Sequence, residues 1–442
     1  MLPNEFLQRM QRLLGEEYDD FLASYERPRN MGIRLNPQKQ SKESLQFCAE
    51  QVPWEANGYY LKQGTRPGLH PLHDAGAYYL QEPSAMAPVG FLQAQPGERV
   101  LDLCAAPGGK TTQIAAAMSG QGLLVCNEIH PKRARILASN IERMGVSNAL
   151  ALNEHPKKLE ERFVSYFDRI LVDAPCSGEG MFRKEDAAVS DWSLETVRMC
   201  ADRQLEILTS AAKMLISGGR LVYSTCTFAP EENEGVIHRF LQRHPNFYVE
   251  KVDAPWFSCG HPEWVEDADA GVRDTFRLLP HKLFGEGHFA AVLRKKGECD
   301  AQEMRIQKTE KLPKAITDFL EKYDINLPHD AVRFGQTYYS VPEMLPSLDG
   351  LKVMRVGLEL GEMKKDRFEP AHALALWLND FKSRVDFSSD STQIAAYLRG
   401  ETISADRQGW TLVFVDGVSL GWAKGSQGVL KNHYPKGLRK LN

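Results

Sequence analysis

The spacing of hydrophobic residues changes several times along the chain, and these changes divide it into regions. Apolar residues at helical spacing between Phe6 and Leu14 are followed by the alternating, strand-like stretch "MGIRLNP". From about residue 71 onward, short apolar runs alternate with helical segments, which is typical of an α/β domain with a mostly parallel sheet. We therefore predict a small mixed N-terminal module at 1–70 and an α/β domain at 71–296.

Four apolar runs are the predicted strands of the α/β domain. They are "ERVLDLC" (98–104), "GLLVCNE" (122–128), "DRILVDAPC" (168–176) and "GRLVYSTC" (219–226). A helix is predicted over 194–216, where Val197, Ala201 and Leu205 recur at helical spacing before "SGG" ends it. "FRLLP" and "GHFAAVLRKK" flank a glycine-containing turn, and they predict a hairpin at the edge of the sheet.

The C-terminal third of the chain predicts two further small modules. The stretch 294–311 is polar and rich in charge, which is typical of a linker. A mixed module is predicted at 312–385 and a β-rich module at 388–442. The pair Asp416–Gly417 lies between apolar runs of the last module and predicts the turn of a hairpin.

Composition narrows the class of protein. The chain has 442 residues and a net charge of −4, so any surface that binds nucleic acid must be a local one. No apolar run approaches the roughly 20 residues of a membrane span, and the N-terminus lacks the apolar core of a signal peptide. Eight scattered cysteines without a C-x-x-C pair indicate reduced thiols in the cytoplasm and no zinc site.

The first predicted strand leads into a glycine loop, "AAPGGK", and then into a helix. Gly108 and Gly109 would let a ligand approach the backbone closely, but their spacing matches neither a phosphate loop nor a dinucleotide fingerprint. Glu128 ends the next strand, where such folds place a carboxylate on ribose hydroxyls. This combination favours a nucleoside without phosphates, namely S-adenosyl-L-methionine. The alternative is an ordinary tight turn and a solvated strand end.

Two later strands each end at a cysteine. Asp173 and Cys176 lie in "DAPCSG", and Cys226 lies in "YSTCTF". Ligands of an open α/β sheet bind outside the carboxyl ends of its strands, so both thiols are expected to face the cleft beside the glycine loop. The other six cysteines are expected to be structural.

A thiol beside a methyl donor suits the methylation of a pyrimidine at carbon 5. Adding a thiolate to carbon 6 makes carbon 5 nucleophilic, and the ring then needs an acid near N3. A base must afterwards remove the proton from carbon 5 before the thiol is eliminated. Asp173 is the candidate acid at the N3 and N4 edge of a cytosine. Spacing alone leaves Cys176 and Cys226 nearly equal as candidate nucleophiles.

Three long motifs carry a resemblance to a known family. "LDLCAAPGGKTTQ", "DAPCSGEGMFRK" and "YSTCTFAPEENE" resemble the nucleotide-binding, Pro-Cys and Thr-Cys motifs of the NSUN-like (Sun/nucleolar-protein) RNA cytosine-5 methyltransferases. The tail resembles the bacterial RsmF-type branch, which acts on small-subunit (16S) ribosomal RNA. This implies a Rossmann-like class I methyltransferase domain, a small N-terminal α+β RNA-binding-like module, and C-terminal ferredoxin-like and PUA-like modules.

The resemblance also implies roles for individual residues. Cys226 matches the nucleophile, Cys176 the cysteine that helps to release the product, and Asp173 the acid at the target base. The positions that match donor-binding residues are Cys104, Ala105, Ala106, Pro107, Gly108, Gly109, Lys110, Glu128 and Asp173. The family often has an Asp near the adenine, where this chain reads "LNEHP", and the contact is left open between Asn153 and Glu154.

The function implied is methylation of carbon 5 of cytosine in 16S ribosomal RNA, through a covalent cysteine–cytosine intermediate. The expected partner is RNA, with no metal and no membrane, and the chain is expected to be a cytoplasmic monomer. Two alternatives are the same chemistry on transfer RNA and a catalytically inactive RNA-binding assembly factor. The intact pair Cys176 and Cys226 argues against the inactive factor.

A few charged residues and one glycine carry further expectations. Arg183 and Lys184 could hold a target phosphate or simply be exposed. Glu231 and Glu232 are expected to stabilise the start of a helix. The last 20 residues contain five Lys or Arg and no acid, which suits RNA binding. A valine at Gly109 is expected to block the donor pocket.

Overall fold

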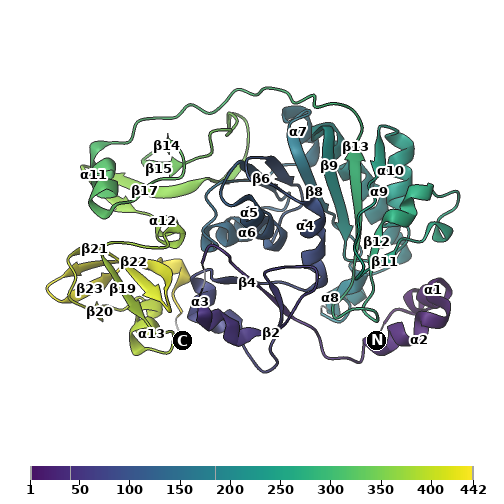
Figure 1. Ribbon diagram of the computed structural model, residues 1–442, viewed down its shortest axis with the longest axis horizontal. Helices are drawn as coiled ribbons and strands as arrows, with labels where there is room; N and C mark the ends of the chain where they lie inside the picture. The colour runs from purple at the N-terminus through teal and green to yellow at the C-terminus, as the bar shows by residue number, and fades with distance from the viewer. Residues whose placement is uncertain (1, 40, 185, 441–442) are drawn as a thin grey trace.

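The computed structural model describes residues 2–39, 41–184 and 186–440, and its centre is a ten-stranded sheet (Figure 1). The sheet order is β11-β12-β13-β9-β8-β5-β6-β7-β16, with β10 paired to β13. The strands are β5 (Arg99–Asp102), β6 (Leu123–Asn127), β7 (Ala149–Leu152), β8 (Phe167–Asp173), β9 (Leu215–Thr225), β10 (Phe247–Val249), β11 (Ser258–Cys259), β12 (Phe276–Leu278), β13 (His288–Lys295) and β16 (Val353–Val356).

Strands β5 to β9 are parallel, and helices cover both faces of the sheet. The helices are α4 (Ala87–Leu92), α5 (Gly109–Met118), α6 (Pro131–Arg143), α7 (Pro156–Arg162), α8 (Asp186–Ser190), α9 (Leu194–Met214) and α10 (Glu234–Arg243). This arrangement confirms the predicted Rossmann-like domain. The order β7-β6-β5-β8-β9 reverses at β5, which is where such folds place the ligand crevice.

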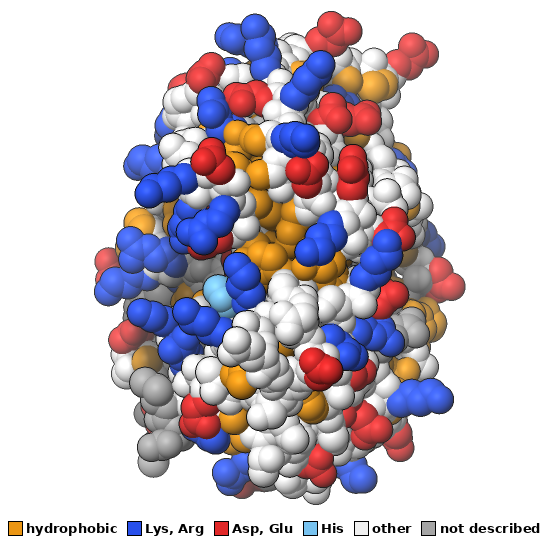
Figure 2. All heavy atoms as spheres, turned by 90° about the vertical axis from the view of Figure 1, so that its left-hand side faces the viewer, with side chains coloured by type: hydrophobic (Ala, Val, Ile, Leu, Met, Phe, Trp, Pro, Cys, Tyr) orange, Lys and Arg blue, Asp and Glu red, His pale blue; other side chains and the backbone are white. Residues whose placement is uncertain are grey.

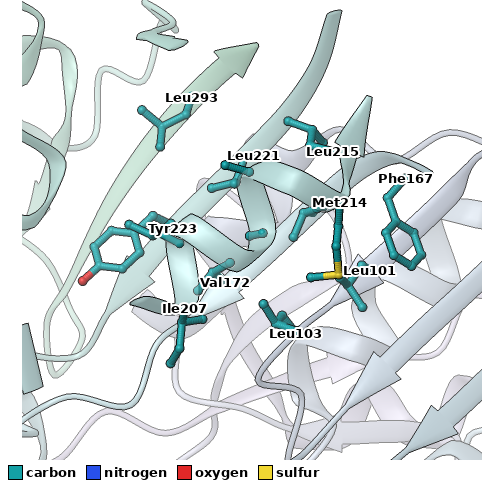
Figure 3. Close-up of a cluster of buried hydrophobic side chains, with 14 of the residues drawn as sticks. Leu101, Leu103, Phe167, Val172, Ile207, Met214, Leu215, Leu221, Tyr223 and Leu293 are labelled. Carbon is teal, nitrogen blue, oxygen red and sulfur yellow. The ribbon is translucent and has the colours of Figure 1, made fainter. Parts of the chain in front are cut away.

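Neighbouring residues of the central strands enter two separate cores, because side chains alternate between the faces of a sheet. Leu101, Val172 and Tyr223 pack with Ile207 and Met214 of α9 on one face (Figure 3). Their sequence neighbours Val100, Leu171 and Val222 belong to the hydrophobic cluster on the other face. Strands buried on both sides explain why these runs are apolar throughout.

The sequence predicted the four strands and the hairpin of this domain, with one difference at 215–219. The hairpin is β12 with β13, and β13 pairs with β9. The helix α9 ends at Met214, and β9 begins at the next residue. "SGG" therefore lies inside a strand, beside an irregularity in its register with β8, rather than in a turn.

The N-terminal module extends beyond residue 70. Its elements are α1 (Asn4–Leu14), α2 (Tyr18–Ser24), β1 (Gly32–Leu35), β2 (Cys48–Gln51), β3 (Gly58–Leu61), α3 (Pro71–Asp74) and β4 (Tyr78–Leu80). The four strands form an antiparallel sheet in the order β2-β3-β1-β4. Helix α1 lies apart from this sheet and packs its Phe6 against Phe182, Trp192 and other residues of the central domain.

The module predicted at 312–385 is not self-contained. Its elements are α11 (Lys314–Tyr323), β14 (Ala331–Phe334), β15 (Thr337–Ser340), β17 (Leu358–Lys364), β18 (Arg367–Pro370) and α12 (His372–Trp377). The chain leaves this module between β15 and β17, and β16 pairs antiparallel with β7 of the central sheet. The remaining strands form a meander, β14-β15-β17-β18, without the helices between strands that a ferredoxin-like order would require.

The last module is a small β-rich unit, as predicted, but it begins before residue 388, because Arg384–Phe387 pairs with a strand of this unit. Its elements are β19 (Arg384–Phe387), α13 (Thr392–Arg399), β20 (Ile403–Ser404), β21 (Gly409–Val415), β22 (Val418–Ser426) and β23 (Val429–Asn432). Asp416 and Gly417, both with positive φ, form the turn between β21 and β22. Trp410 and Trp422 of this unit share a hydrophobic core with Phe319 of α11, so the two C-terminal modules are packed together.

Candidate active site

The carboxyl ends of β5, β6, β8 and β9 surround a cavity of about 850 Å³. Residues from all four strand ends line it, including Cys104, Ala106, Glu128, Ile129, Asp173, Cys176 and Cys226. Parallel strands bring their carboxyl ends to one edge, so motifs far apart in the sequence meet there. The structure thus brings the glycine loop, the carboxylate and both thiols into one cavity.

The two thiols are in direct contact. Cys176 Sγ lies 3.3 Å from Cys226 Sγ, and both side chains are partly buried. The hydrogen bond to Cys226, burial and the nearby Glu232 carboxylate raise the pKa of Cys176 well above its usual range. Cys176 is therefore a protonated thiol at neutral pH.

Asp173 is held by two side chains at the end of β8. Lys110 Nζ donates to its Oδ2 at 2.7 Å, and Ser224 Oγ donates to its Oδ1 at 2.7 Å. Burial opposes the charge of Asp173, but the Lys110 ammonium and these hydrogen bonds lower its pKa overall. Burial likewise opposes the charge of Lys110, while Asp173 and the Cys226 sulfur raise the pKa of Lys110. Asp173 and Lys110 are thus an ion pair at neutral pH.

Glu128 is a buried carboxylate that lines the cavity. Its Oε1 accepts a hydrogen bond from the backbone N–H of His130 at 2.8 Å, and its Oε2 lies 3.4 Å from Arg133 Nη1. Arg133 also donates to the carbonyl oxygen of Ala106 at 2.6 Å. Arg133 therefore connects the glycine loop with the end of β6 across the cavity wall.

The glycine loop contributes fewer side-chain positions to the cavity than the sequence predicted. Within the described chain, Cys104 and Ala106 line it, whereas Ala105, Pro107, Gly108, Gly109 and Lys110 do not. A Cβ at Gly108, whose φ is +112°, would face Leu137 of α6. A Cβ at Gly109 would face the Tyr79 ring at 3.1 Å, in the N-terminal sheet. The expectation that a valine at Gly109 blocks the donor pocket is therefore wrong.

The segment after β7 meets the cavity through residues other than the two candidates. Asn153 Nδ2 donates to the carbonyl oxygen of Glu128 at 2.7 Å, and Glu154 Oε1 accepts from Lys158 at 2.7 Å. Among described residues of this segment, His155 and Pro156 line the cavity, and Asn153 and Glu154 do not. Of the pattern "LNEHP", it is therefore the last two residues that face the cavity.

The Arg183 guanidinium is used in contacts within the protein and is not free to bind RNA. Its guanidinium forms an ion pair with Glu286 at 2.7 Å and donates to the carbonyl oxygen of Ser24. The side chain is almost fully buried, so it cannot reach an RNA phosphate. Lys184, its neighbour, is exposed.

Three polar residues of this region had no site role in the sequence-based prediction. Ser224 binds Asp173, while Glu179 and Glu232 are fully buried between the two cysteine loops. Ser224 comes directly before the Thr-Cys pair at the end of a predicted strand. The parallel pairing of that strand with β8 could have predicted that Ser224 lies beside Asp173. Glu179 and Glu232 could not be recognised as buried from the sequence, because the segments that cover them are distant in the chain.

Neither a metal site nor a membrane span is found among the described residues. No group of three or more His, Cys, Asp or Glu side chains in that part of the chain could hold a metal ion. None of its helices is both long and apolar enough to cross a lipid bilayer.

Comparison with family models assigns four consecutive matches. Residues 2–83 match the N-terminal domain of 16S rRNA methyltransferase RsmF, and residues 89–294 match 16S rRNA methyltransferase RsmB/F. Residues 318–378 match the RsmF rRNA methyltransferase first C-terminal domain, and residues 384–440 match the methyltransferase RsmF PUA domain.

Relatives and solved structures agree with these matches. Ribosomal RNA small subunit methyltransferase F of Vibrio vulnificus is 32% identical over 99% of this chain and 97% of its own length. The same-named protein of Shewanella piezotolerans is 31% identical over 96% and 94%. A methyltransferase homolog from Pyrococcus horikoshii superposes with a TM-score of 0.59 at 29% identity, covering 66% of this chain and 95% of its own. NSun6 from the same organism, solved with SFG, shares the fold (TM-score 0.58, 23% identity, 67% and 99% coverage).

Proposed function

The chain belongs to the RsmF family of 16S rRNA methyltransferases, and we propose that it methylates carbon 5 of a cytosine in small-subunit ribosomal RNA. The methyl donor is S-adenosyl-L-methionine. The observation that carries this proposal is the contact between Cys176 and Cys226 beside the Asp173–Lys110 pair, in the cavity that Glu128 also lines.

The residues of the cavity fit the donor. Glu128 offers a buried carboxylate oxygen for ribose hydroxyls, and Leu103, Ile129 and Pro156 offer apolar surface for an adenine. The glycine loop begins helix α5 at Gly109. When bound, the donor supplies an electrophilic methyl group. Glu128 would orient it, and Asp173 would lie between it and the target base.

Cys226 is the proposed nucleophile. Its sulfur forms a bond to carbon 6 of the cytosine, and the electron pair of the 5,6 double bond becomes available at carbon 5. The Lys110 ammonium interacts with both the Cys226 sulfur and Asp173, so a positive charge lies beside the proposed nucleophile.

Asp173 and Lys110 would act on the pyrimidine edge as a pair. Because its pKa is lowered, Asp173 is a carboxylate that accepts a hydrogen bond from the N4 amino group. The group that can donate a proton toward N3 is then the Lys110 ammonium, 2.7 Å from Asp173 Oδ2. This refines the sequence-based role, in which Asp173 alone was the acid.

Cys176 is proposed to complete the reaction. After transfer, the proton on carbon 5 must leave, and the bond between carbon 6 and Cys226 must break. Cys176 is a protonated thiol in contact with the Cys226 sulfur, so it can give its proton to that sulfur as the carbon–sulfur bond breaks, and the Cys176 thiolate left behind can accept the proton from carbon 5. Without it, the covalent complex would accumulate.

RNA binding is proposed for the modules outside the central domain. Lys and Arg side chains gather on the face formed by the C-terminal modules, on both sides of a hydrophobic strip (Figure 2). Lys364, Lys424 and Lys431 of these modules have exposed side chains. We expect a cytoplasmic monomer that uses this surface to hold ribosomal RNA while the target cytosine enters the cavity.

Bisulfite sequencing of ribosomal and transfer RNA tests the proposed function. A strain that lacks the gene should lose 5-methylcytosine at one or more positions of 16S RNA, and wild-type protein should restore it. The Cys226→Ala variant, expressed at the same level, should not. Loss confined to transfer RNA would contradict the ribosomal substrate, and no loss anywhere would contradict the activity.

A further inference from the structure

The two cysteine-bearing loops are joined by contacts that run in both directions. We call residues 174–182 the Pro-Cys loop and residues 225–233 the Thr-Cys loop. Each loop contributes one fully buried glutamate, and each glutamate accepts a hydrogen bond from the backbone of the other loop. Neither glutamate lines the cavity or can touch the substrate.

Glu232 belongs to the Thr-Cys loop and holds the Pro-Cys loop. Its Oε2 accepts from the backbone N–H of Ser177 at 3.0 Å and from Gln204 Nε2 at 2.7 Å. Gln204 also donates to the carbonyl oxygen of Pro175 at 3.0 Å. Ser177, after Cys176, is therefore bound to Glu232 directly, and Pro175, before it, is bound through the Gln204 amide.

Glu179 belongs to the Pro-Cys loop and holds the Thr-Cys loop. Its Oε2 accepts from the backbone N–H of Phe228 at 3.0 Å. Its Oε1 accepts from Trp192 Nε1 at 2.9 Å and from Arg9 of helix α1. Both oxygens of Glu179 are thus occupied, whereas Glu232 Oε1 has no hydrogen-bond partner among the described residues.

Two further contacts complete the junction. Ser177 Oγ lies 2.9 Å from Thr227 Oγ1, and the backbone N–H of Gly180 donates to the carbonyl oxygen of Cys226 at 2.8 Å. A Cβ at Gly180 would lie 2.9 Å from that same oxygen, so only glycine permits this approach.

We propose that Glu232 and Glu179 are positioning residues, which clasp the two loops reciprocally and hold the Cys176 and Cys226 sulfurs in contact. Buried hydrogen bonds to a carboxylate are among the strongest in proteins, and their donors here are backbone groups one or two residues from each cysteine. The reaction needs the second thiol beside the first when the carbon–sulfur bond breaks. This inference rests on the proposed function for its purpose, but its geometry can be tested without RNA or donor.

The charge of Glu232 gives it a second effect on the thiols. The Glu232 carboxylate is one cause of the raised pKa of Cys176, and burial raises the pKa of Glu232 itself to about 7. The negative charge of Glu232 keeps Cys176 protonated, whereas the Cys226 sulfur interacts with the Lys110 ammonium. The clasp thus supports the different roles of two otherwise similar cysteines.

The rate of disulfide formation between Cys176 and Cys226 measures their contact directly. Diamide accepts two electrons and two protons from a thiol pair, forming one S–S bond and a hydrazine. Full-length protein is treated with diamide, quenched at intervals, and digested, and the Cys176–Cys226 peptide is quantified by mass. Counting this peptide alone excludes the six other cysteines.

Three variants test whether the Glu232 side chain holds the two loops together. Glu232→Ala should slow formation of the Cys176–Cys226 disulfide by about tenfold or more, because the loops are no longer fixed to each other. Glu232→Gln should not slow it, because one carbonyl oxygen can accept both bonds that Oε2 accepts, and loss of the charge removes one cause of the raised pKa of Cys176. The matched control Glu231→Ala, on the same turn but with an exposed side chain, should also stay within about twofold.

Unchanged disulfide formation in a folded Glu232→Ala protein would overturn the proposal. If that variant does not fold, glutamine substitutions decide instead. Both oxygens of Glu179 accept hydrogen bonds, so Glu179→Gln loses an acceptor and should slow disulfide formation. Glu232→Gln keeps the one oxygen that accepts and should not slow it. Equal rates in the two variants would overturn the proposal. The two proposals can fail separately. If the variants change the rate of Cys176–Cys226 disulfide formation as expected but the wild-type protein methylates no RNA, the proposed function is contradicted and the clasp is not.

Discussion

The central domain and the C-terminal modules place their charges in opposite ways. In the central domain, the charged residues of the site form ion pairs in which one partner is largely buried, as Lys110 is beside Asp173 and Glu128 is beside Arg133. On the C-terminal modules, Lys and Arg side chains are spread over an exposed face (Figure 2). Lys424 and Lys431 of these modules have exposed side chains. Chemistry requires fixed positions, whereas affinity for a phosphate backbone requires only enough positive charge. Substitutions in the two regions should therefore affect different quantities.

The largest effect is expected in the central domain, at Asp173. Asp173→Ala removes the partner of Lys110 and the carboxylate proposed for the pyrimidine edge. We expect the single-turnover rate of methylation to fall by about a thousandfold, in the range found for lost acid–base groups. Ser224→Ala, which removes one hydrogen bond to the same carboxylate, should cost about tenfold. A lower single-turnover rate in Ser224→Ala than in Asp173→Ala would contradict this order.

A smaller effect is expected at the donor side of the same cavity. Glu128→Ala should weaken binding of S-adenosyl-L-methionine by roughly 10- to 100-fold, as expected for hydrogen bonds to a charged group. Calorimetric titration measures it. Glu154→Ala is the matched control, since Glu154 binds Lys158 outside the cavity, and its donor affinity should stay within about twofold of wild type. Weaker donor binding by Glu154→Ala would place the adenine contact there after all.

In the C-terminal modules, the expected effect is on RNA affinity alone. The double variant Lys424→Glu, Lys431→Glu should weaken RNA binding by about tenfold and reduce its salt dependence by about two ion contacts. Its donor affinity should not change. This surface variant is preferable to a truncation near residue 297, because removing β16 would take a strand out of the central sheet. Unchanged RNA affinity and salt dependence would show that RNA binds elsewhere.

The smallest effect on donor binding is expected at Gly109. Because its Cβ would face Tyr79, Gly109→Val should lower the free energy of unfolding by about 1–3 kcal/mol through overpacking. Thermal unfolding measures this, and donor affinity should stay within about twofold. A normal unfolding temperature combined with lost donor binding would restore the view that this position faces the donor.

The sequence predicted the parts of the molecule whose signal is local. The strands β5, β6, β8 and β9 are continuous apolar runs, and a parallel sheet brings their ends together, so Asp173, Cys176 and Cys226 were placed in one site. The family motifs then separated the roles of the two thiols, which spacing could not do.

The sequence could not predict contacts that form only in the folded chain. The strand β16 adds to the free edge of β7, and its short run "VMRV" carries no sign of that partner. Glu232 and Arg183 have the sequence context of exposed residues, yet distant segments bury them. The direction in which Gly109 would present a side chain depends on the packing of the N-terminal sheet, which periodicity does not encode.

The proposal that Cys226 attacks the base and Cys176 releases it is tested most directly by trapping the covalent complex. Each variant is incubated with unmethylated 16S RNA and S-adenosyl-L-methionine, and a denaturing gel is used to detect protein bound to RNA. Cys176→Ala should accumulate a slowly migrating adduct that contains methylated cytosine, because Cys226 adds but is not released. Cys226→Ala should form no adduct and no 5-methylcytosine. An adduct from Cys226→Ala and none from Cys176→Ala would contradict the account and make Cys176 the nucleophile.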